Sequence, residues 1–430
     1  MNGALLEFLG IFLLLILTGM PIAWSMASAV LAYMALTGQW QLLPALPEKM
    51  FQGMDAFVLV AIPLFLLAGD LFSEGGIAQR LISFASVLLG KVPGGVAQVA
   101  IGACVFFAGI TGVALGEIAA LGRIFIPAMV RAGYPAPFAA AVIASASIIG
   151  PTIPPSLPII IYGAATNVSI GGMFAAAVLP GLVVAVAQML LVAFYAPRFG
   201  IEPDRLDRSP RAIARSARQA VLPLGMPVLV LAAIMGGLFT PTEAAGASVA
   251  YAAVCAFVIY RSLALHHVPA MLARVTTFSG QLIIIVACGT AFAWVLGFEN
   301  VTSTLAQQIE TLKFTRTEVL LIANVVYLIL GMFIDPTTSI ILFAPIFAPI
   351  ALAAGVDPLH FGVITILNLN VGLITPPLGV SLFAAERIAG CGLRPVIVAA
   401  LPFIAVSVAA LGLVTVFPGL SLWLPRAMGF

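Results

Sequence analysis

The sequence predicts an all-α polytopic membrane protein built from two inverted-topology repeats. Of its 430 residues, 62% are apolar and only 8% are charged, whereas soluble domains carry about 25% charged residues. Uncharged apolar runs such as 170–196 exceed the about 18 residues that indicate a membrane span. The third observation is an internal repeat, because residues 109–155 align without a gap on residues 331–377.

The repeat is marked by residues that break helices. Ten of the 47 aligned positions are identical. They include Gly109 with Gly331, Pro127 with Pro349, Gly133 with Gly355, Gly150 with Gly372, and Pro154-Pro155 with Pro376-Pro377. A shared apolar composition would match Ala, Ile and Leu by chance, but not these glycines and prolines. We therefore divide the chain into a first repeat (1–197), a basic loop (198–218) and a second repeat (219–430).

The first repeat begins with two short apolar runs, 4–18 and 20–37, and a more polar stretch, 38–54, which we expect to be a connector or a surface helix. A span at 55–73 precedes segment 76–91, whose Arg80 and Lys91 favour an amphipathic helix at the membrane surface. Residues 96–108 are too few to cross a membrane, and 113–131 lead back, so we expect a re-entrant helical hairpin at about 93–133. A helix at 135–166, broken at 150–155, and an unbroken span at 170–197 complete this half.

The second repeat follows the same plan. We expect spans at 221–238, 243–260 and 279–298, with a basic connector at 261–275 and a surface segment at 300–313. The second hairpin, about 316–355, has arms 318–330 and 339–355 and a tip at Gly331–Thr338. A broken helix at 358–388 and a span at 395–424 follow. Each half therefore contains five spans and one hairpin.

Five spans is an odd number, so the two repeats are predicted to have opposite orientations. Basic residues favour the cytoplasmic side. With loop 198–218 in the cytoplasm, fourteen of the 18 Lys and Arg residues lie inside and four outside. We expect a bacterial inner-membrane protein with both termini in the periplasm.

The helix breaks are the predicted centre of function. Inverted repeats with broken helices are typical of secondary transporters. A break exposes carbonyl oxygens, which suit sodium, and helix N-termini, which suit a carboxylate. Gly150 and Gly372 allow the breaks, and the Pro-Pro pairs that follow can begin the next half-helix. The alternative is two unrelated proline kinks in structural helices.

Polar residues at the hairpin tips are the next candidates. Gly109–Gly112 offers backbone groups and a hydroxyl, and the second tip offers Asp335, Thr337 and Thr338. A carboxylate at membrane depth costs about 2.5–3.5 kcal/mol and so favours a functional role. Asp335 could instead cap the returning helix, or do both. Glu117 is a weaker candidate, and Asn368 and Asn370 are left open as lining residues of the second break.

Several other chemistries are excluded by the sequence. Gly90-Lys91 is followed by Val92, so there is no P-loop for nucleotide hydrolysis. The three histidines lack HExxH spacing and the four cysteines lack CxxC spacing, which predicts no transition-metal centre and no cofactor. The first apolar run has no Lys or Arg before it and does not resemble a cleavable signal peptide. The dispersed basic residues do not indicate nucleic-acid binding.

The pieces FFAGITG, FIPAMVRAGY, IIGPTIPPSLPIIIYG, LGMFIDPTTSIILFAPI and NVGLITPPLG resemble the large membrane subunit of TRAP transporters (tripartite ATP-independent periplasmic transporters, DctM-like). The resemblance covers essentially the whole chain. It implies an elevator-type, sodium-driven importer of organic acids such as C4-dicarboxylates or sialic acid. It also implies two partners, a separate small four-helix membrane subunit and a periplasmic substrate-binding protein.

The resemblance also implies site residues. The first sodium site would involve Ala108, Gly109, Thr111, Gly150 and Thr152, and the second Gly331, Gly372 and Thr375. Many relatives have serines where this chain has Ala108 and Thr111. The expected substrate site consists of Thr111, Gly112, Pro154, Ser156, Asp335, Thr337, Thr338, Asn370 and Pro376.

Two other functions remain as alternatives. One is a stand-alone sodium/dicarboxylate symporter that needs no binding protein. The other is an intramembrane enzyme, which would require a Ser/Lys dyad or paired aspartates at depth. Asp335 has no such partner in the sequence, so we expect a transporter and not an enzyme.

Overall fold

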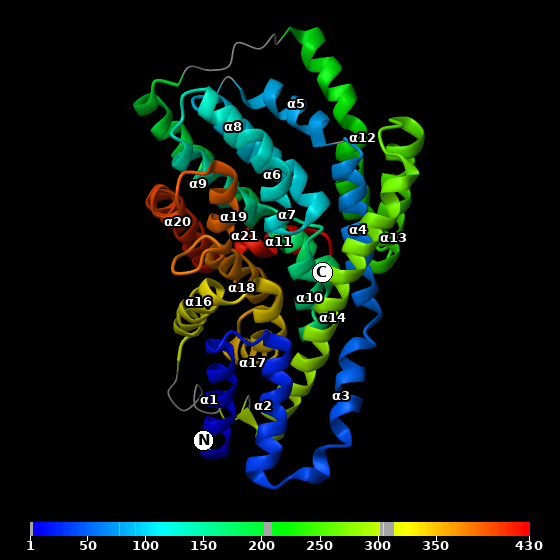
Figure 1. Cartoon of the computed structure of the whole chain (residues 1–430), viewed down its shortest axis with the longest axis vertical. Coiled ribbons are helices and arrows are strands. Elements are labelled where there is room, and N and C mark those ends of the chain that lie inside the picture. Colours follow the sequence, from blue (N-terminus) through cyan, green and yellow to red (C-terminus); the bar gives the residue numbers. More distant parts are fainter. Residues whose placement is uncertain (1–2, 77, 91, 202–208, 302–303, 305–313) are drawn as a thin grey trace.

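The computed structural model describes the chain from residue 3 to residue 430, except for residues 77, 91, 202–208, 302–303 and 305–313. Every regular element in these described ranges is a helix. Eight helices or helix pairs among them are long and apolar enough to cross a membrane. α5, α8 and the start of α12 lie at one end of the molecule's long axis, and α1 and α2 lie toward the other (Figure 1).

The first half contains the elements expected from its sequence. The helices are α1 (Gly3–Leu17), α2 (Ile22–Thr37), α3 (Ala45–Met54), α4 (Ala61–Glu74), α5 (Ala78–Leu89), α6 (Gly95–Thr111), α7 (Ala114–Glu117), α8 (Arg123–Arg131), α9 (Ala136–Ala146), α10 (Leu157–Thr166) and α11 (Ile170–Tyr195). Short 3-10 turns lie at η1 (Trp40–Leu42), η2 (Phe57–Val60), η4 (Ser147–Ile149) and η5 (Ala196–Phe199). A π-helical turn, η3 (Ile118–Gly122), joins α7 to α8 without interruption.

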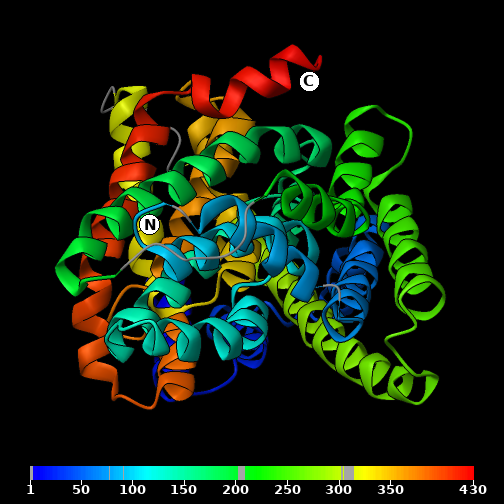
Figure 2. The same cartoon turned by 90° about the horizontal axis from the view of Figure 1, so that it is seen from above.

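The second half contains longer helices. They are α12 (Pro210–Met235), α13 (Pro241–Ala253), α14 (Val268–Phe298), α16 (Arg316–Phe333), α17 (Pro336–Ala353), α18 (Pro358–Gly372), α19 (Val380–Ala389), α20 (Leu393–Val416) and α21 (Gly419–Ala427). The π-helical turn η6 (Val254–Ile259) extends α13, and the 3-10 turn η7 (Leu265–His267) precedes α14. In both views α4 and α13 run side by side, and they are in contact (Figures 1 and 2).

The two predicted helix breaks are present. α9 and α10 are separated by residues 147–156, and α18 and α19 by residues 373–379. Both Pro-Pro bonds, Pro154-Pro155 and Pro376-Pro377, are cis. All of residues 147–156 are buried, so the first break lies inside the protein and not at its surface.

Several predicted boundaries were wrong. The basic loop was expected to reach residue 218, but α12 begins at Pro210, because proline is well tolerated in a first turn and Ala and Arg are good helix formers. The basic connector 261–275 is helical from Val268 for the same reason, with a proline at the second position. The second tip is shorter than expected, since α16 continues through Gly331 to Phe333.

The last predicted span is present, but its predicted C-terminal boundary was wrong. It was expected to run from 395 to 424, but α20 ends at Val416 and α21 begins at Gly419. Pro418 lies between them, and a proline there cannot continue the hydrogen-bond ladder of α20. Both arms of the second hairpin are 18 residues long and long enough to cross a membrane, so its re-entrant character stays a prediction. The predicted surface segment 300–313 lies largely outside the described residues.

Two clusters of buried apolar side chains hold the helices together. The larger cluster runs through both hairpins and both broken helices. The smaller one joins α1 and α2 to α14, where Phe8 packs on Phe292 with ring centroids 4.5 Å apart. α14 therefore contacts α2, which belongs to the smaller cluster, and α17, which contributes to the larger one.

Candidate functional site

Both hairpin tips and both helix breaks meet at one cavity of about 240 Å³. Its wall is formed by residues 112–115 of the first tip, 151, 157 and 158 of the first break, 335–337 of the second tip, 370 and 373 of the second break, and one face of α14. The four segments singled out by the sequence are thus neighbours in space. None of the described residues that line the cavity is Lys, Arg or His.

Three helix N-termini face this cavity. The arm formed by α7, η3 and α8 begins there after Val113, α10 begins there after Ser156, and α17 begins there after Asp335. A helix N-terminus carries about half a positive charge and unpaired backbone N–H groups. Neither Val113 nor Ser156 caps its helix with a side chain. Two N-termini therefore present partial positive charge and unpaired N–H groups to the cavity without a basic side chain, an arrangement that suits an anion.

The third N-terminus is capped by Asp335. Its Oδ1 atom accepts a hydrogen bond from the backbone N of Thr338 at 3.0 Å, and its Oδ2 atom accepts the Thr338 hydroxyl. Asp335 and Thr337 also line the cavity, while Thr338 is buried behind them. The two roles considered for Asp335, a cap and a site residue, are therefore compatible in one geometry.

The first tip packs closely on the first break. Gly112 has φ +58°, and a methyl group there would lie 3.1 Å from the carbonyl oxygen of Pro155. Only glycine suits both the left-handed backbone and this approach. Gly109 is likewise close to Pro154, because a methyl group on it would lie 3.4 Å from that residue's oxygen. The hydroxyl of Ser156 donates to the carbonyl oxygen of Pro151 at 2.5 Å.

The second break contributes an asparagine that links the two halves. The Nδ2 atom of Asn370 donates to the Oγ1 atom of Thr152 at 3.1 Å, and the Thr152 hydroxyl donates to the carbonyl of Ile148. The Oδ1 atom of Asn370 is buried and has no hydrogen-bond partner in the described part of the protein. Since Asn370 lines the cavity, this oxygen is available to a bound ion or substrate.

The residues of the second expected sodium site lie together. A methyl group on Gly372 would lie 2.3 Å from the carbonyl carbon of Gly331, so α16 and α18 touch through their backbones. The backbone N of Thr375 donates to the carbonyl of Gly372 at 2.9 Å, and its hydroxyl donates to that of Val371 at 2.8 Å. Carbonyl oxygens and a hydroxyl oxygen thus gather at the end of α18.

The residues of the first expected sodium site come from α6 and from the first break. Ala108 is buried on α6, Thr111 is the last residue of that helix, and the Thr111 side chain lies outside the described residues. Gly150 lies against the carboxylate of Glu117, since a methyl group on Gly150 would come within 2.2 Å of its Oε1 atom. Glu117 is fully buried and also contacts Cys104. It does not line the cavity, but it places an acidic group beside Gly150.

Of the expected substrate residues, Gly112, Asp335, Thr337 and Asn370 line the cavity, whereas Pro154, Ser156 and Thr338 do not. Pro376 is half-buried and is absent from its lining. Asn368 is turned toward α16, where its Nδ2 atom donates to the backbone oxygen and to the Oδ1 atom of Asn324, each at 2.8 Å. Asn368 thus joins α18 to α16 and leaves Asn370 as the asparagine at the cavity.

Sequence reasoning missed the face of α14 that completes the wall. Phe278, Gln281, Leu282 and Ile285 line the cavity from this helix. The only signal for them was an amide, Gln281, in an otherwise apolar run. An apolar periodicity cannot tell which face of such a helix meets a cavity and which meets lipid.

A second cavity of about 760 Å³ adjoins the first and shares Val113, Leu115 and Phe278 with it. Arg274 of α14 lies in its wall, where it pairs with Asp70 at 3.1 Å and with Glu74. Arg123 of α8 faces the same space as an exposed cation. The central cavity thus continues into a wider space lined by charged residues.

The sequence matches the family described as "Tripartite ATP-independent periplasmic transporter, DctM component" over residues 9–420. It is 38% identical to the C4-dicarboxylate TRAP transporter large permease protein DctM of Pseudomonas aeruginosa, over 90% of each chain. It is 35% identical to the sialic acid TRAP transporter large permease protein SiaM of Vibrio cholerae, over 99% of this chain and 98% of that one. The fold resembles the crystal structure of the Alcanivorax borkumensis YdaH transporter, with a TM-score of 0.64, 17% identity and 90% of each chain covered.

Proposed function

Because the chain belongs to the DctM-component family of tripartite ATP-independent periplasmic transporters, we propose that it imports an organic acid across the bacterial inner membrane, driven by sodium ions. The observation that carries this proposal is the cavity into which three helix N-termini point. It lies where both hairpin tips meet both helix breaks. In such a place irregular backbone is tolerated because it lines a cavity and binds solutes.

The substrate is a carboxylate. Two uncapped helix N-termini stabilise an anion without a Lys or Arg that would hold it too tightly for release. The relatives named for C4-dicarboxylate and for sialic acid transport both concern carboxylic acids. Phe278, Leu282 and Ile285 supply an apolar wall that fits the carbon skeleton of such a molecule.

Sodium binds at the two breaks. The carbonyls around Gly331 and Gly372 and the hydroxyl of Thr375 are uncharged oxygen ligands, which suit a hard monovalent cation. In the first half, the Glu117 carboxylate beside Gly150 adds the negative charge that favours a cation there. Asn370 links the two breaks through Thr152 and has an acceptor oxygen without a partner among the described residues.

Transport proceeds by an elevator movement. The two hairpins and two broken helices form the moving unit, and α4, α13 and α14 belong to the fixed one. The cavity lies on the boundary, because α14 supplies one wall and the moving unit supplies the rest. The second cavity, with Arg123 on the moving side and Arg274 on the fixed side, is the substrate's path toward the cytoplasm.

The protein works with a small four-helix membrane subunit and a periplasmic substrate-binding protein. The test is reconstitution of the purified chain in liposomes with labelled C4-dicarboxylates or sialic acid outside. We expect uptake only when both partners and a sodium gradient are present. Robust uptake by this chain alone would favour a stand-alone symporter. Uptake with both partners that a proton gradient drives fully without sodium would refute the sodium coupling.

A further inference from the structure

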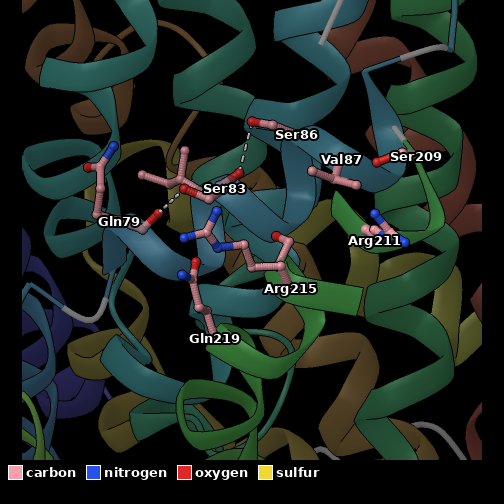
Figure 3. Close-up of a pocket in the computed structure, with 10 residues that line it drawn as sticks. Gln79, Ser83, Ser86, Val87, Ser209, Arg211, Arg215 and Gln219 are labelled. Carbon is pink, nitrogen blue, oxygen red and sulfur yellow. Dashed lines mark hydrogen bonds between the residues drawn. The ribbon is translucent and has the colours of Figure 1, made fainter. Parts of the chain in front are cut away.

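A groove of about 770 Å³ lies between α5 and the start of α12, at the end of the molecule opposite α1 (Figures 1 and 3). α5 contributes Ser83 and Ser86 to it, and α12 contributes Arg211, Arg215 and Ser216. This groove and the cavity between the hairpin tips share no lining residue. The proposed transport cycle does not use this groove.

The groove concentrates positive charge. Arg211 and Arg215 are four residues apart on one face of α12, both are exposed, and neither makes an ion pair within the described ranges. Like charges at this spacing repel each other, and the N-terminus of a helix adds a further partial positive charge. The first turn of α12 contains no acidic residue to offset them. An anion bound in the groove would offset this positive charge.

A buried hydroxyl independently indicates a ligand. Ser216 is only 7% exposed, it lines the groove, and its Oγ atom has no hydrogen-bond partner among the described residues. Buried polar atoms without a partner are uncommon in native proteins. A hydroxyl can donate to an oxyanion held by the neighbouring arginines. Across the groove, the Ser83 and Ser86 hydroxyls are already engaged with backbone carbonyls of α5 at 2.9 Å.

We propose that this groove binds the phosphate group of an anionic phospholipid. Arginine forks match phosphate oxygens, and basic pockets near the membrane surface hold such headgroups. A lipid is favoured over free phosphate because the same two helices expose large apolar side chains, Leu88 by 47% and Ile213 by 40%. Acyl chains can cover these side chains while the headgroup lies between Arg211 and Arg215.

The experiment measures lipid binding to the purified full-length chain in neutral detergent by native mass spectrometry. Phosphatidylglycerol is the probe and phosphatidylcholine the zwitterionic control. The groove variant is Arg211→Gln/Arg215→Gln. The matched control is Arg198→Gln/Arg218→Gln, which removes the same charge at residues that do not line the groove. The groove variant should bind phosphatidylglycerol about 25-fold more weakly, and the control variant within about twofold of the unmodified chain.

A third variant, Ser216→Ala, keeps both charges and should weaken binding about tenfold, since a hydrogen bond to a charged group is lost. Equal losses in the groove and control variants would overturn the proposal, as would equal binding of the two lipids or no effect of Ser216→Ala. Displacement of phosphatidylglycerol by millimolar inorganic phosphate would assign the groove to a soluble anion and overturn the lipid assignment.

Discussion

Asn370 and Thr152 are 218 residues apart in the sequence, yet the Nδ2 atom of Asn370 donates a hydrogen bond to the Oγ1 atom of Thr152 at 3.1 Å. The bond joins the last turn of α18 to the break between α9 and α10. Both side chains are buried, so water does not compete for it. The two breaks are therefore linked directly, beside the cavity that they share.

We expect this link to be measurable by a double-mutant cycle. Asn370→Ala and Thr152→Val should each lower the free energy of unfolding, because each leaves a buried polar group without its partner, at about 1–3 kcal/mol. The double variant should lose less than the sum, with a coupling of about 1 kcal/mol. Denaturant titration in detergent micelles measures it. Strict additivity would mean that the hydrogen bond contributes nothing to stability.

The contact between Gly331 and Gly372 gives a second prediction. A methyl group on Gly372 would press on the backbone of Gly331, and a backbone cannot move aside as a flexible side chain can. Gly372→Ala should therefore destabilise the protein by about 1–3 kcal/mol and reduce uptake. Gly412→Ala is the control, since that residue lies inside α20 with open space around it. It should be neutral or stabilise by about 0.5–1 kcal/mol. Equal effects would show that the close approach is unimportant.

The helix breaks could be predicted because glycine and proline act through the backbone, whatever surrounds them. Gly150, Gly372 and the two Pro-Pro pairs therefore indicated where α9 and α18 end. The meeting of Asn370 with Thr152 could not be predicted, because neither residue is at the other's repeat-related position. Such a contact depends on how the two halves pack, which no local pattern encodes.

The predicted helix boundaries were wrong where we took charged residues as the sign of a loop. The arginines at 211, 215 and 218 suggested a solvated segment, but Arg is a good helix former, and they form the first turns of α12.

The part of the cavity wall that α14 supplies was missed for another reason. Phe278, Leu282 and Ile285 are ordinary apolar residues of a span, and only the packing of α14 against α17 gives them a place at the site.

The predicted inverted topology gives a third testable outcome. In a background with Cys391→Ser, which removes the half-buried cysteine, a cysteine at the exposed position Ala214 should react with impermeant reagents only from the cytoplasm. One at the exposed position Thr317 should react only from the periplasm. The positive-inside distribution is the physical reason. Labelling of both from one side of oriented vesicles would contradict the inverted repeats.

Asp335 allows its two roles to be separated. Asn caps helices about as well as Asp, so Asp335→Asn should keep the hydrogen bond from the Thr338 backbone and leave the unfolding midpoint nearly unchanged. Asp335→Ala should lose about 1 kcal/mol. If the carboxylate takes part in transport, both variants should lose uptake to a similar extent. Normal uptake by Asp335→Asn would assign Asp335 to capping alone.

Sodium coupling is tested at Thr375. Its hydroxyl donates to the carbonyl of Val371 at 2.8 Å, which leaves the lone pairs of the hydroxyl oxygen free to coordinate the cation proposed beside Gly331 and Gly372. Thr375→Ala should raise the sodium concentration for half-maximal uptake about tenfold, equivalent to about 1.4 kcal/mol. Thr415→Ala is the control, because Thr415 is also buried and its hydroxyl donates to the carbonyl of Leu411 at 2.8 Å, on α20 and away from the cavity. Its oxygen also accepts a hydrogen bond from Asn324 at 3.0 Å, so this variant removes at least as many contacts as Thr375→Ala. Its sodium dependence should be unchanged.

Two bound sodium ions would give a Hill coefficient above one. They would make uptake of a monoanion electrogenic, because the complex then carries one net charge, worth about 2.3 kcal/mol per 100 mV. A dianion would cancel both charges, and its uptake would not respond to the membrane potential. An unchanged sodium dependence in Thr375→Ala, together with a shift in Thr415→Ala, would place the ion elsewhere and remove Gly331 and Gly372 from its coordination.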